Sequence, residues 1–193
     1  KWLVALLVLS SLSACVPVVF VGGAALGMWI GSDPRKPEAI KEDFDTGAQL
    51  SARVVDTYKD RAHVNVNVFN DLVLLTGEVP DEAAKQQIEQ FAWQRAHRPR
   101  KVFNELVVAA PSSTSARLND SQLSVRVKTA VLAAAGDASA VHIMIVTERQ
   151  TVYLMGIAKP AIVEKAARAA SRVSGVKQVV KLVELDAAKP GDS

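Results

Sequence analysis

Hydrophobic and polar residues follow two different periods in neighbouring stretches of the chain. The stretch "HVNVNVF", which begins at His63, alternates valine with asparagine. An alternation with a period of two residues is typical of a half-buried β-strand. Residues 45–60 instead place Leu50, Val54 and Tyr58 at helical spacing on one face. These two patterns predict a helix followed by a strand.

The residues after this strand predict three further elements. Asn70 and Asp71 are favourable turn residues, and the apolar run "LVLLTGEV" follows them, so the two strands should form a hairpin. A helix is expected to begin near Pro80 and Asp81, since proline suits a first helical turn. The stretch "KVFNELVVA" then predicts a last strand. The order of elements is therefore αββαβ.

The same order of elements occurs a second time. The stretch "HIMIVTERQTVYLMGIA" begins at His142, 79 residues after His63, and it aligns with the first hairpin over its whole length. Apolar residues at helical spacing predict a helix over residues 121–134, and Lys159-Pro160 marks the start of another helix. An internal repeat of this length predicts two similar units in tandem.

We therefore expect an α+β fold made of two αββαβ units, each with two helices on one face of a three-stranded mixed sheet. Each unit buries only a marginal core, so contact between the units is expected. Gly77 and Gly156 fall at equivalent strand positions, where a bulge or a close approach to the neighbouring helix explains a glycine better than a ligand loop does. The domain boundaries that follow are a signal peptide at 1–14, a lipidated N-terminus and linker at 15–44, domains at 45–110 and 120–186, a linker at 111–119 and a tail at 187–193.

The N-terminus has the character of a targeting segment. Lys1 precedes an uncharged apolar run, and small residues follow that run, as in a secretory signal peptide. The sequence Leu12-Ser13-Ala14-Cys15 is similar to a bacterial lipobox, and this similarity implies that Cys15 becomes the acylated first residue of the mature protein. The alternative is an uncleaved membrane helix within residues 2–31, which is apolar for long enough to span a bilayer.

Composition and charge exclude several classes of function. The net charge is only +3, which gives no general basic field for nucleic acid. A single cysteine excludes an internal disulfide bond and a multi-cysteine zinc site. His63, His97 and His142 lack the spacing of a metal-binding motif, and no nucleophile elbow or phosphate loop is present. We therefore expect a protein that is not an enzyme and has no cofactor, metal site or small-molecule substrate.

The two units resemble BON domains, because each carries a Leu-x-Gly sequence in its second strand. The lipobox and the stretch "TERQTVYLMGIAKPAIVEKAARAASRVSGVKQVV" are similar to the dual-BON outer-membrane lipoproteins of proteobacteria. This resemblance implies a lipid-anchored protein on the periplasmic face of the outer membrane that binds anionic phospholipid and supports envelope integrity and outer-membrane protein assembly. Val16, where inner-membrane sorting signals carry Asp, agrees with that location. The alternative is an envelope scaffold that binds a partner protein without specific lipid binding.

The charge pattern and the resemblance together place the lipid contact in the second unit. Residues 116–186 carry 10 basic and 6 acidic side chains, whereas residues 45–110 carry 8 and 9. The resembling family contacts lipid through the first helix of its second unit, with an Asn-Asp pair that Asn119 and Asp120 match and an aromatic residue that Gln122 replaces. Val125 and Leu132 could instead contact the other unit. The predicted phospholipid-binding residues are Gln122, Leu123, Val125, Arg126, Lys128, Thr129 and Leu132.

Overall fold

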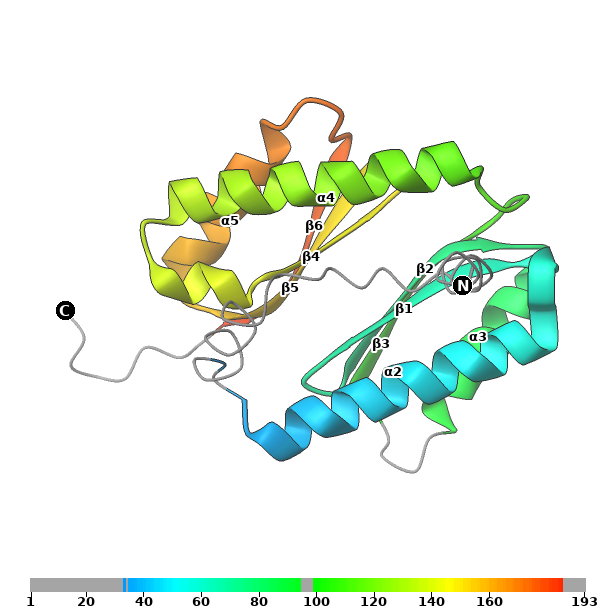
Figure 1. The fold of residues 1–193 in the computed structure, drawn as a ribbon. Helices are drawn as coiled ribbons and strands as arrows, with labels where there is room; N and C mark the ends of the chain where they lie inside the picture. The colour runs from blue at the N-terminus through cyan, green and yellow to red at the C-terminus, as the bar shows by residue number, and fades with distance from the viewer. Residues whose placement is uncertain (1–32, 34, 95–98, 186–193) are drawn as a thin grey trace, which may run out of the picture. The chain divides into compact units, whose positions relative to one another are not determined.

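Two αββαβ domains follow one another along the part of the chain that the structure describes. The computed structural model describes residues 33, 35–94 and 99–185 (Figure 1). Cys15 and the possible membrane span within residues 2–31 lie outside these residues. No helix among those described has the length and the apolar character needed to cross a membrane.

The first domain contains two helices and a three-stranded sheet. Its elements are α2 (Pro37–Tyr58), the 3₁₀ turn η1 (Lys59–Arg61), β1 (His63–Phe69), β2 (Leu72–Val79), α3 (Glu82–Trp93) and β3 (Lys101–Val108). The second domain repeats this order with α4 (Thr114–Ala135), the 3₁₀ segment η2 (Ala138–His142), β4 (Met144–Glu148), β5 (Thr151–Ala158), α5 (Pro160–Ser171) and β6 (Gln178–Leu185).

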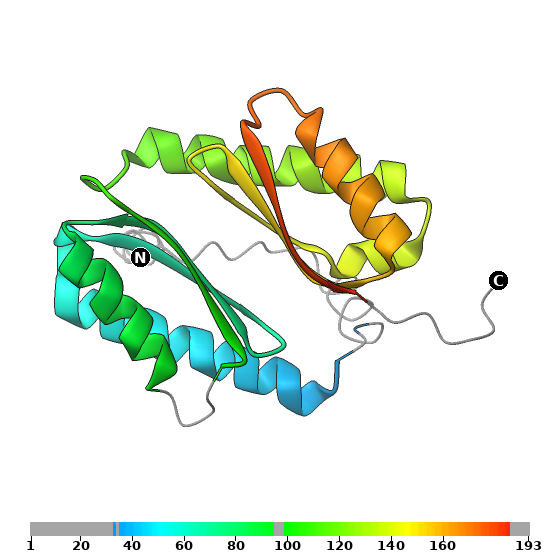
Figure 2. The same ribbon diagram turned by 180° about the vertical axis from the view of Figure 1, so that it is seen from behind.

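The two sheets have the same mixed topology. In the first sheet β2 is central and pairs antiparallel with β1 and parallel with β3. In the second sheet β5 is central and pairs in the same way with β4 and β6. The two helices of each domain cover one face of its sheet (Figures 1 and 2). The predicted α+β fold of two tandem αββαβ domains is confirmed.

Each domain has its own apolar core between helices and sheet. In the first domain Leu50 and Val54 of α2 and Ile88 of α3 pack against the sheet. In the second domain Leu123 and Val127 of α4 occupy the corresponding place. The valines of β1 contribute to the first core, which explains their alternation with asparagine.

The other faces of the two sheets form a third apolar cluster. Phe69, Leu72 and Leu74 of the first domain pack with Tyr153 and Met155 of the second. Both domains belong to one compact unit, Asp33–Ser193. Every residue of β2 is buried, because one face of the strand meets the helices and the other meets the second sheet. This double burial explains why "LVLLTGEV" is an apolar run and does not alternate.

Each hairpin turn is held by a buried carboxylate from the first helix of its domain. Asn70 and Asp71 have φ angles of 51° and 61°, and the backbone N–H groups of both donate to Asp43. Asp120 accepts the equivalent bonds in the second domain. Neither turn contains the glycine that such φ angles favour, so the carboxylates stabilise an otherwise strained conformation.

Gly77 and Gly156 are needed where backbone passes close to backbone. A Cβ atom at Gly77, whose φ is +113°, would lie 2.0 Å from the carbonyl oxygen of His63. A Cβ atom at Gly156 would lie 2.8 Å from the carbonyl oxygen of His142. The expected close approach is therefore present, but at Gly77 it involves the backbone at the start of β1 and at Gly156 the backbone at the end of η2, just before β4, and not an α-helix.

Both predicted linkers are partly helical. Residues 37–44 belong to α2, where Pro37 occupies the first helical turn and needs no N–H partner. Residues 114–119 belong to α4, because the Ser113 side chain accepts a hydrogen bond from the backbone N–H of Ala116 and caps the helix. Both helices therefore begin before residues 45 and 121, where their apolar periodicity predicted them to start, because the residues of their first turns are polar or capping residues that also occur in loops.

Candidate functional site

The outward face of α4 carries a row of exposed apolar side chains. Leu118, Val125 and Leu132 are spaced by seven residues, so they lie near one line along the helix. Their side chains are 59%, 59% and 42% exposed. Val125 and Leu132 therefore do not form the contact with the first domain that their sequence also allowed, since the sheets make that contact. Leu118 was not predicted, because it precedes the expected start of the helix.

Hydroxyl groups on this face form hydrogen bonds within the helix and therefore do not depend on water. Gln122 and Thr129 are exposed between the apolar side chains. The Thr129 hydroxyl donates to the carbonyl oxygen of Val125, and the Ser121 hydroxyl donates to that of Arg117. Hydroxyl groups satisfied within the helix lower the cost of moving the face into a less polar environment.

Arg126 provides a positive charge at the edge of this face. Its side chain is exposed, and its Nη1 atom donates to the backbone carbonyl oxygen of Ser174 at 3.2 Å. The guanidinium group of Arg126 therefore remains accessible to an anion, and its contact with phospholipid stays a prediction.

Lys128 does not lie free on the outward face as predicted. Its Nζ atom donates to the backbone carbonyl oxygens of Ala140, Val141 and Ile143, at 3.3, 2.7 and 2.6 Å. Burial lowers the pKa of Lys128 to about 8. The long side chain turns toward η2 and the start of β4, so its charge stabilises the fold and is not available to a headgroup.

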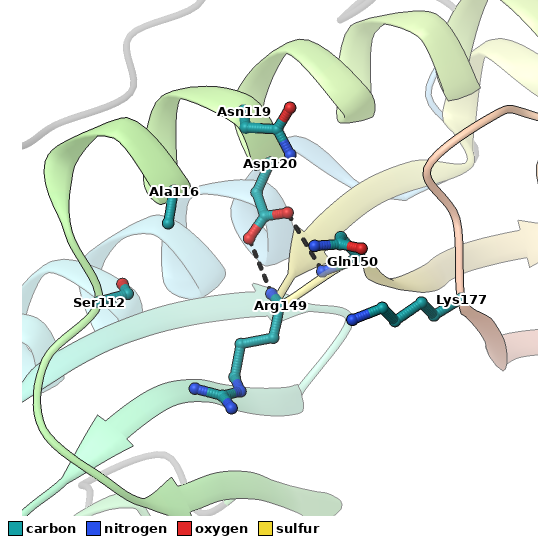
Figure 3. Close-up of a pocket in the computed structure, with 7 residues that line it drawn as sticks. All are labelled: Ser112, Ala116, Asn119, Asp120, Arg149, Gln150 and Lys177. Atoms are coloured by element: carbon teal, nitrogen blue, oxygen red, sulfur yellow. Dashed lines mark hydrogen bonds between the residues drawn. The ribbon is translucent and has the colours of Figure 1, made fainter.

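Leu123 and Asp120 face inward. Leu123 is fully buried in the second core, so it is not an exposed contact in this structure. Asp120 accepts the backbone N–H groups of Arg149 and Gln150 at 2.8 and 3.1 Å, as Figure 3 shows. The Asp of the Asn-Asp pair therefore holds a turn, whereas Asn119 is exposed beside a pocket of about 250 Å³.

The outward face of α2 differs from that of α4 in charge. It exposes Phe44 and Val55, whose side chains are 74% and 62% exposed. Within Pro37–Tyr58 the acidic residues outnumber the basic ones, whereas α4 exposes Arg126 beside its apolar row and has a single acidic residue, Asp120, which is buried. Of the two apolar helix faces, only that of α4 therefore suits an anionic surface.

A polar cluster lies at one end of the contact between the sheets. His63 Nδ1 lies 3.1 Å from an oxygen of Glu78, and the amide nitrogen of Asn65 donates to Glu148 at 2.6 Å. Burial raises the pKa of Glu148 to about 7, against the hydrogen bond from Asn65, and the charge of Glu78 raises it further. Burial also lowers the pKa of His63. Burial opposes ionisation of Glu78, but the Ser112 backbone N–H and His63 hold its pKa below the ordinary value.

The stretch 95–101 is rich in basic residues, with Arg95, His97, Arg98, Arg100 and Lys101, but residues 95–98 lie outside the described ranges. Arg100 forms an ion pair with Glu184 at 2.7 Å and donates to the carbonyl oxygen of Asn70. The Lys101 ammonium lies 4.6 Å from the centre of the Phe103 ring. Both cations therefore have partners within the protein.

Comparison with known proteins finds matches along both domains. The model of the BON domain matches residues 42–110 and 119–187. The chain is 29% identical over 177 residues to the outer membrane lipoprotein DolP of Haemophilus influenzae, which covers 89% of this chain and 88% of the relative. It is also 29% identical over 125 residues to the 21 kDa hemolysin of Actinobacillus pleuropneumoniae, covering 65% and 63% of the two chains. Among solved structures, CdsD, a structural protein of the type III secretion system of Chlamydia trachomatis, aligns at 12% identity over 75% of this chain and 94% of its own, with a TM-score of 0.31.

Proposed function

The chain belongs to the BON-domain family, and from this premise we propose that it is an outer-membrane lipoprotein whose second domain docks onto anionic phospholipid through the outward face of α4. The observation that carries the proposal is the row of exposed apolar residues on α4 beside the exposed Arg126. In this role the protein faces the periplasm and supports envelope integrity and protein assembly by binding and not by catalysis.

The proposed location is supported by the N-terminal sequence and by a relative. Leu12-Ser13-Ala14-Cys15 has the order of a lipobox, and the relative from Haemophilus influenzae is named an outer membrane lipoprotein. Acyl chains on Cys15 would hold the domains close to the membrane, where even a weak contact is populated because its effective concentration is high. Mass spectrometry of the mature N-terminus tests this part, and an unmodified Cys15 behind an intact leader would contradict it.

The contact itself is expected to be weak and to depend on charge. Fully burying one Val or Leu side chain contributes about 1.5–3 kcal/mol, and the three partly exposed residues of α4 offer only a fraction of that each. A basic residue near an anionic surface adds about 1 kcal/mol. Insertion to the boundary between headgroups and acyl chains is therefore favourable on an anionic bilayer and marginal on a zwitterionic one.

A local fluorescent probe separates this contact from insertion of the N-terminal segment. Val125→Cys, in a full chain that also carries Cys15→Ser, places an environment-sensitive label on α4. Val55→Cys places the same label on α2, where the side chain is equally exposed. We expect a blue shift at position 125 on phosphatidylglycerol vesicles, little on phosphatidylcholine vesicles, and none at position 55. The proposal fails if position 125 does not respond or if both positions respond equally.

Charge reversal identifies the basic residue that contributes. Arg126→Glu should reduce the response on phosphatidylglycerol vesicles and change thermal stability only slightly, because the side chain is exposed and loses a single exposed hydrogen bond, to the Ser174 carbonyl oxygen. Lys128 is unsuitable for this test, since its replacement removes three hydrogen bonds to backbone carbonyl groups.

The acidic, apolar face of α2 favours a second candidate function, in which that face binds a partner protein of the cell envelope. Phe44 is the most exposed large apolar side chain among the described residues. A photocrosslinker at position 44 that captures a protein in cells, and still does so in the Arg126→Glu variant, would support this function independently of lipid binding.

A further inference from the structure

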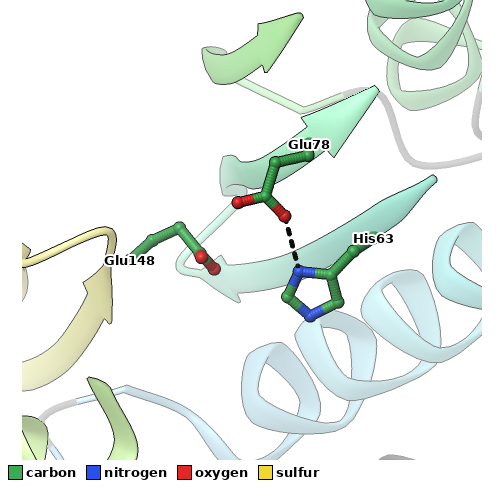
Figure 4. Close-up of side chains that lie close together, drawn as sticks. All are labelled: His63, Glu78 and Glu148. Carbon is green, nitrogen blue, oxygen red and sulfur yellow. Dashed lines mark hydrogen bonds and ion pairs between the residues drawn. The ribbon is translucent and has the colours of Figure 1, made fainter. Parts of the chain in front are cut away.

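Three side chains that can bind a metal converge between the two sheets. His63 comes from β1 and Glu78 from β2, so the first domain supplies both. Glu148 comes from the end of β4 in the second domain. One donor atom from each residue lies within 4.8 Å of the donor atoms of the other two. Figure 4 shows the Glu148 carboxylate directed toward His63 and Glu78.

Both carboxylates of the cluster are buried. Glu78 is 0% exposed and Glu148 is 6% exposed. Burying two carboxylates side by side is costly unless cations or hydrogen bonds compensate for it. The protein groups that contact them are His63, Asn65, the backbone N–H of Ser112, and Arg149.

The internal repeat shows that the fold does not demand a carboxylate at either position. By the offset of 79 residues, Glu78 corresponds to Ile157 in the second domain, and Glu148 corresponds to Phe69 in the first. Ile157 and Phe69 both pack in the apolar cluster between the sheets. The fold therefore accepts an apolar residue at each equivalent position. The presence of a buried glutamate at both positions is explained better by a local chemical role than by packing.

Among the described residues, Arg149 forms a long ion pair with Glu78 of this cluster. Its Nη1 atom lies 3.4 Å from Glu78, and the Arg149 side chain is 53% exposed. Such a pair contributes little to stability, and the guanidinium group is free to move into solvent. The position opposite Glu78 can therefore be taken by another cation without loss of a buried contact.

We propose that His63, Glu78 and Glu148 form a binding site for a divalent transition-metal ion of the Zn²⁺ class, which links the two domains. One imidazole and two carboxylates are a ligand set that suits Zn²⁺, whereas Ca²⁺ requires six to eight oxygen ligands. A divalent cation neutralises both carboxylates at once. Asn65, already bonded to Glu148, orients that ligand as outer-sphere partners do in metal sites.

The three side chains need to move only slightly to bind a zinc ion. Bonds of about 2.0–2.2 Å to a tetrahedral zinc ion place ligand atoms roughly 3.3 Å apart. The three donor atoms, which lie within 4.8 Å of each other, approach this spacing by rotation of side chains. The fourth position is left for water.

The test is a calorimetric titration of the untagged, chelator-treated full chain with Zn²⁺. We expect one ion per chain, a rise in melting temperature that chelator reverses, and no comparable heat with Ca²⁺. Glu148→Gln keeps the shape of the side chain and the bond from Asn65 but removes a charged ligand, so it should weaken Zn²⁺ binding at least about tenfold. A downfield or broadened His63 ring signal on titration would place the ion at this cluster.

Glu184→Gln is the matched control, because Glu184 is a second carboxylate that contacts the other domain, partly buried where Glu148 is buried, but it lies with Asn70 and Arg100. This variant should bind Zn²⁺ like the unchanged protein. The proposal is overturned if Zn²⁺ does not bind, if Glu148→Gln binds it equally well, or if the two variants weaken binding to the same extent.

Discussion

Asp120 offers a direct test of how the second hairpin turn is held. Its carboxylate accepts the backbone N–H groups of Arg149 and Gln150, which have φ angles of 52° and 65°. Asp120→Ala removes both acceptors and leaves a turn of two non-glycine residues in a conformation that they rarely adopt. We therefore expect a loss of folding stability and not a loss of lipid binding, although Asp120 belongs to the Asn-Asp pair of the helix that we propose contacts lipid.

The magnitude follows from the two hydrogen bonds. A hydrogen bond to a charged group contributes about 1.5–3 kcal/mol net. Asp120 lines a pocket together with Arg149 and Gln150, which gives solvent room to replace part of the lost bonding, so we take the low end for each bond and expect Asp120→Ala to cost about 3 kcal/mol. Asp120→Asn keeps one acceptor oxygen and should cost about half as much. Asn119→Ala, at an exposed position, should change stability by less than about 0.5 kcal/mol.

Urea unfolding followed by circular dichroism measures these differences in the full chain. The amide signals of Arg149 and Gln150 provide a local reading, and both should shift in the two Asp120 variants. The reasoning is refuted if Asp120→Ala costs less than about 1 kcal/mol or if it is no more destabilising than Asp120→Asn.

Two further predictions concern the strand glycines and the buried Glu148. Gly77→Ala should prevent the first domain from folding, because the new Cβ atom would lie 2.0 Å from a backbone oxygen. Gly156→Ala, with the corresponding contact at 2.8 Å, should cost about 2–4 kcal/mol of folding stability. Equal melting temperatures for the two variants would contradict the prediction that Gly77→Ala is the more damaging. Burial raises the pKa of Glu148 from 4.5 to about 7 in the folded protein. Between pH 4.5 and 7 the folded protein therefore keeps a proton on Glu148 that the unfolded chain has released. The contribution of Glu148 to folding stability consequently falls as pH rises through that window. The stability of Glu148→Gln relative to the unchanged protein, measured with chelator present, should therefore increase from pH 5 to pH 8. The lowered pKa of His63 has the opposite effect on stability, but it acts in both proteins. A stability difference that does not change with pH would disprove the raised pKa of Glu148.

Much of the fold is readable from local patterns. The alternation that begins at His63 and the turn residues Asn70 and Asp71 mark a hairpin that the structure contains. The helix starts were less accessible, because Pro37 and Ser113 are residues that begin helices but also occur in loops. A sequence pattern alone does not separate these two uses.

The candidate site was predicted in part. Helical periodicity placed Val125 and Leu132 outward, as the structure does. It also placed Lys128 outward, because a helical wheel describes where the Cα atom lies and not where a long flexible side chain ends. The carbonyl groups that Lys128 reaches belong to η2 and to Ile143, at the entrance to β4, and their position depends on tertiary packing.

The cluster of His63, Glu78 and Glu148 could not be found by motif spacing. Its members lie 15 and 70 residues apart along the chain and come from two domains. One signal was present in the sequence, namely that a charged residue interrupts the repeat where the other copy has an apolar one. Comparing the two halves position by position would have pointed to both carboxylates.

The connection between the domains is only five residues long, from 109 to 113, between the end of β3 and the start of α4. A connection this short keeps each sheet within reach of the other at a local concentration far above that of any competitor in solution. The apolar cluster between the sheets can thus persist even if its intrinsic affinity is low. Inserting a long Gly-Ser segment here would let the two domains separate and expose Phe69, Leu72 and Tyr153, which would create an apolar surface prone to aggregation.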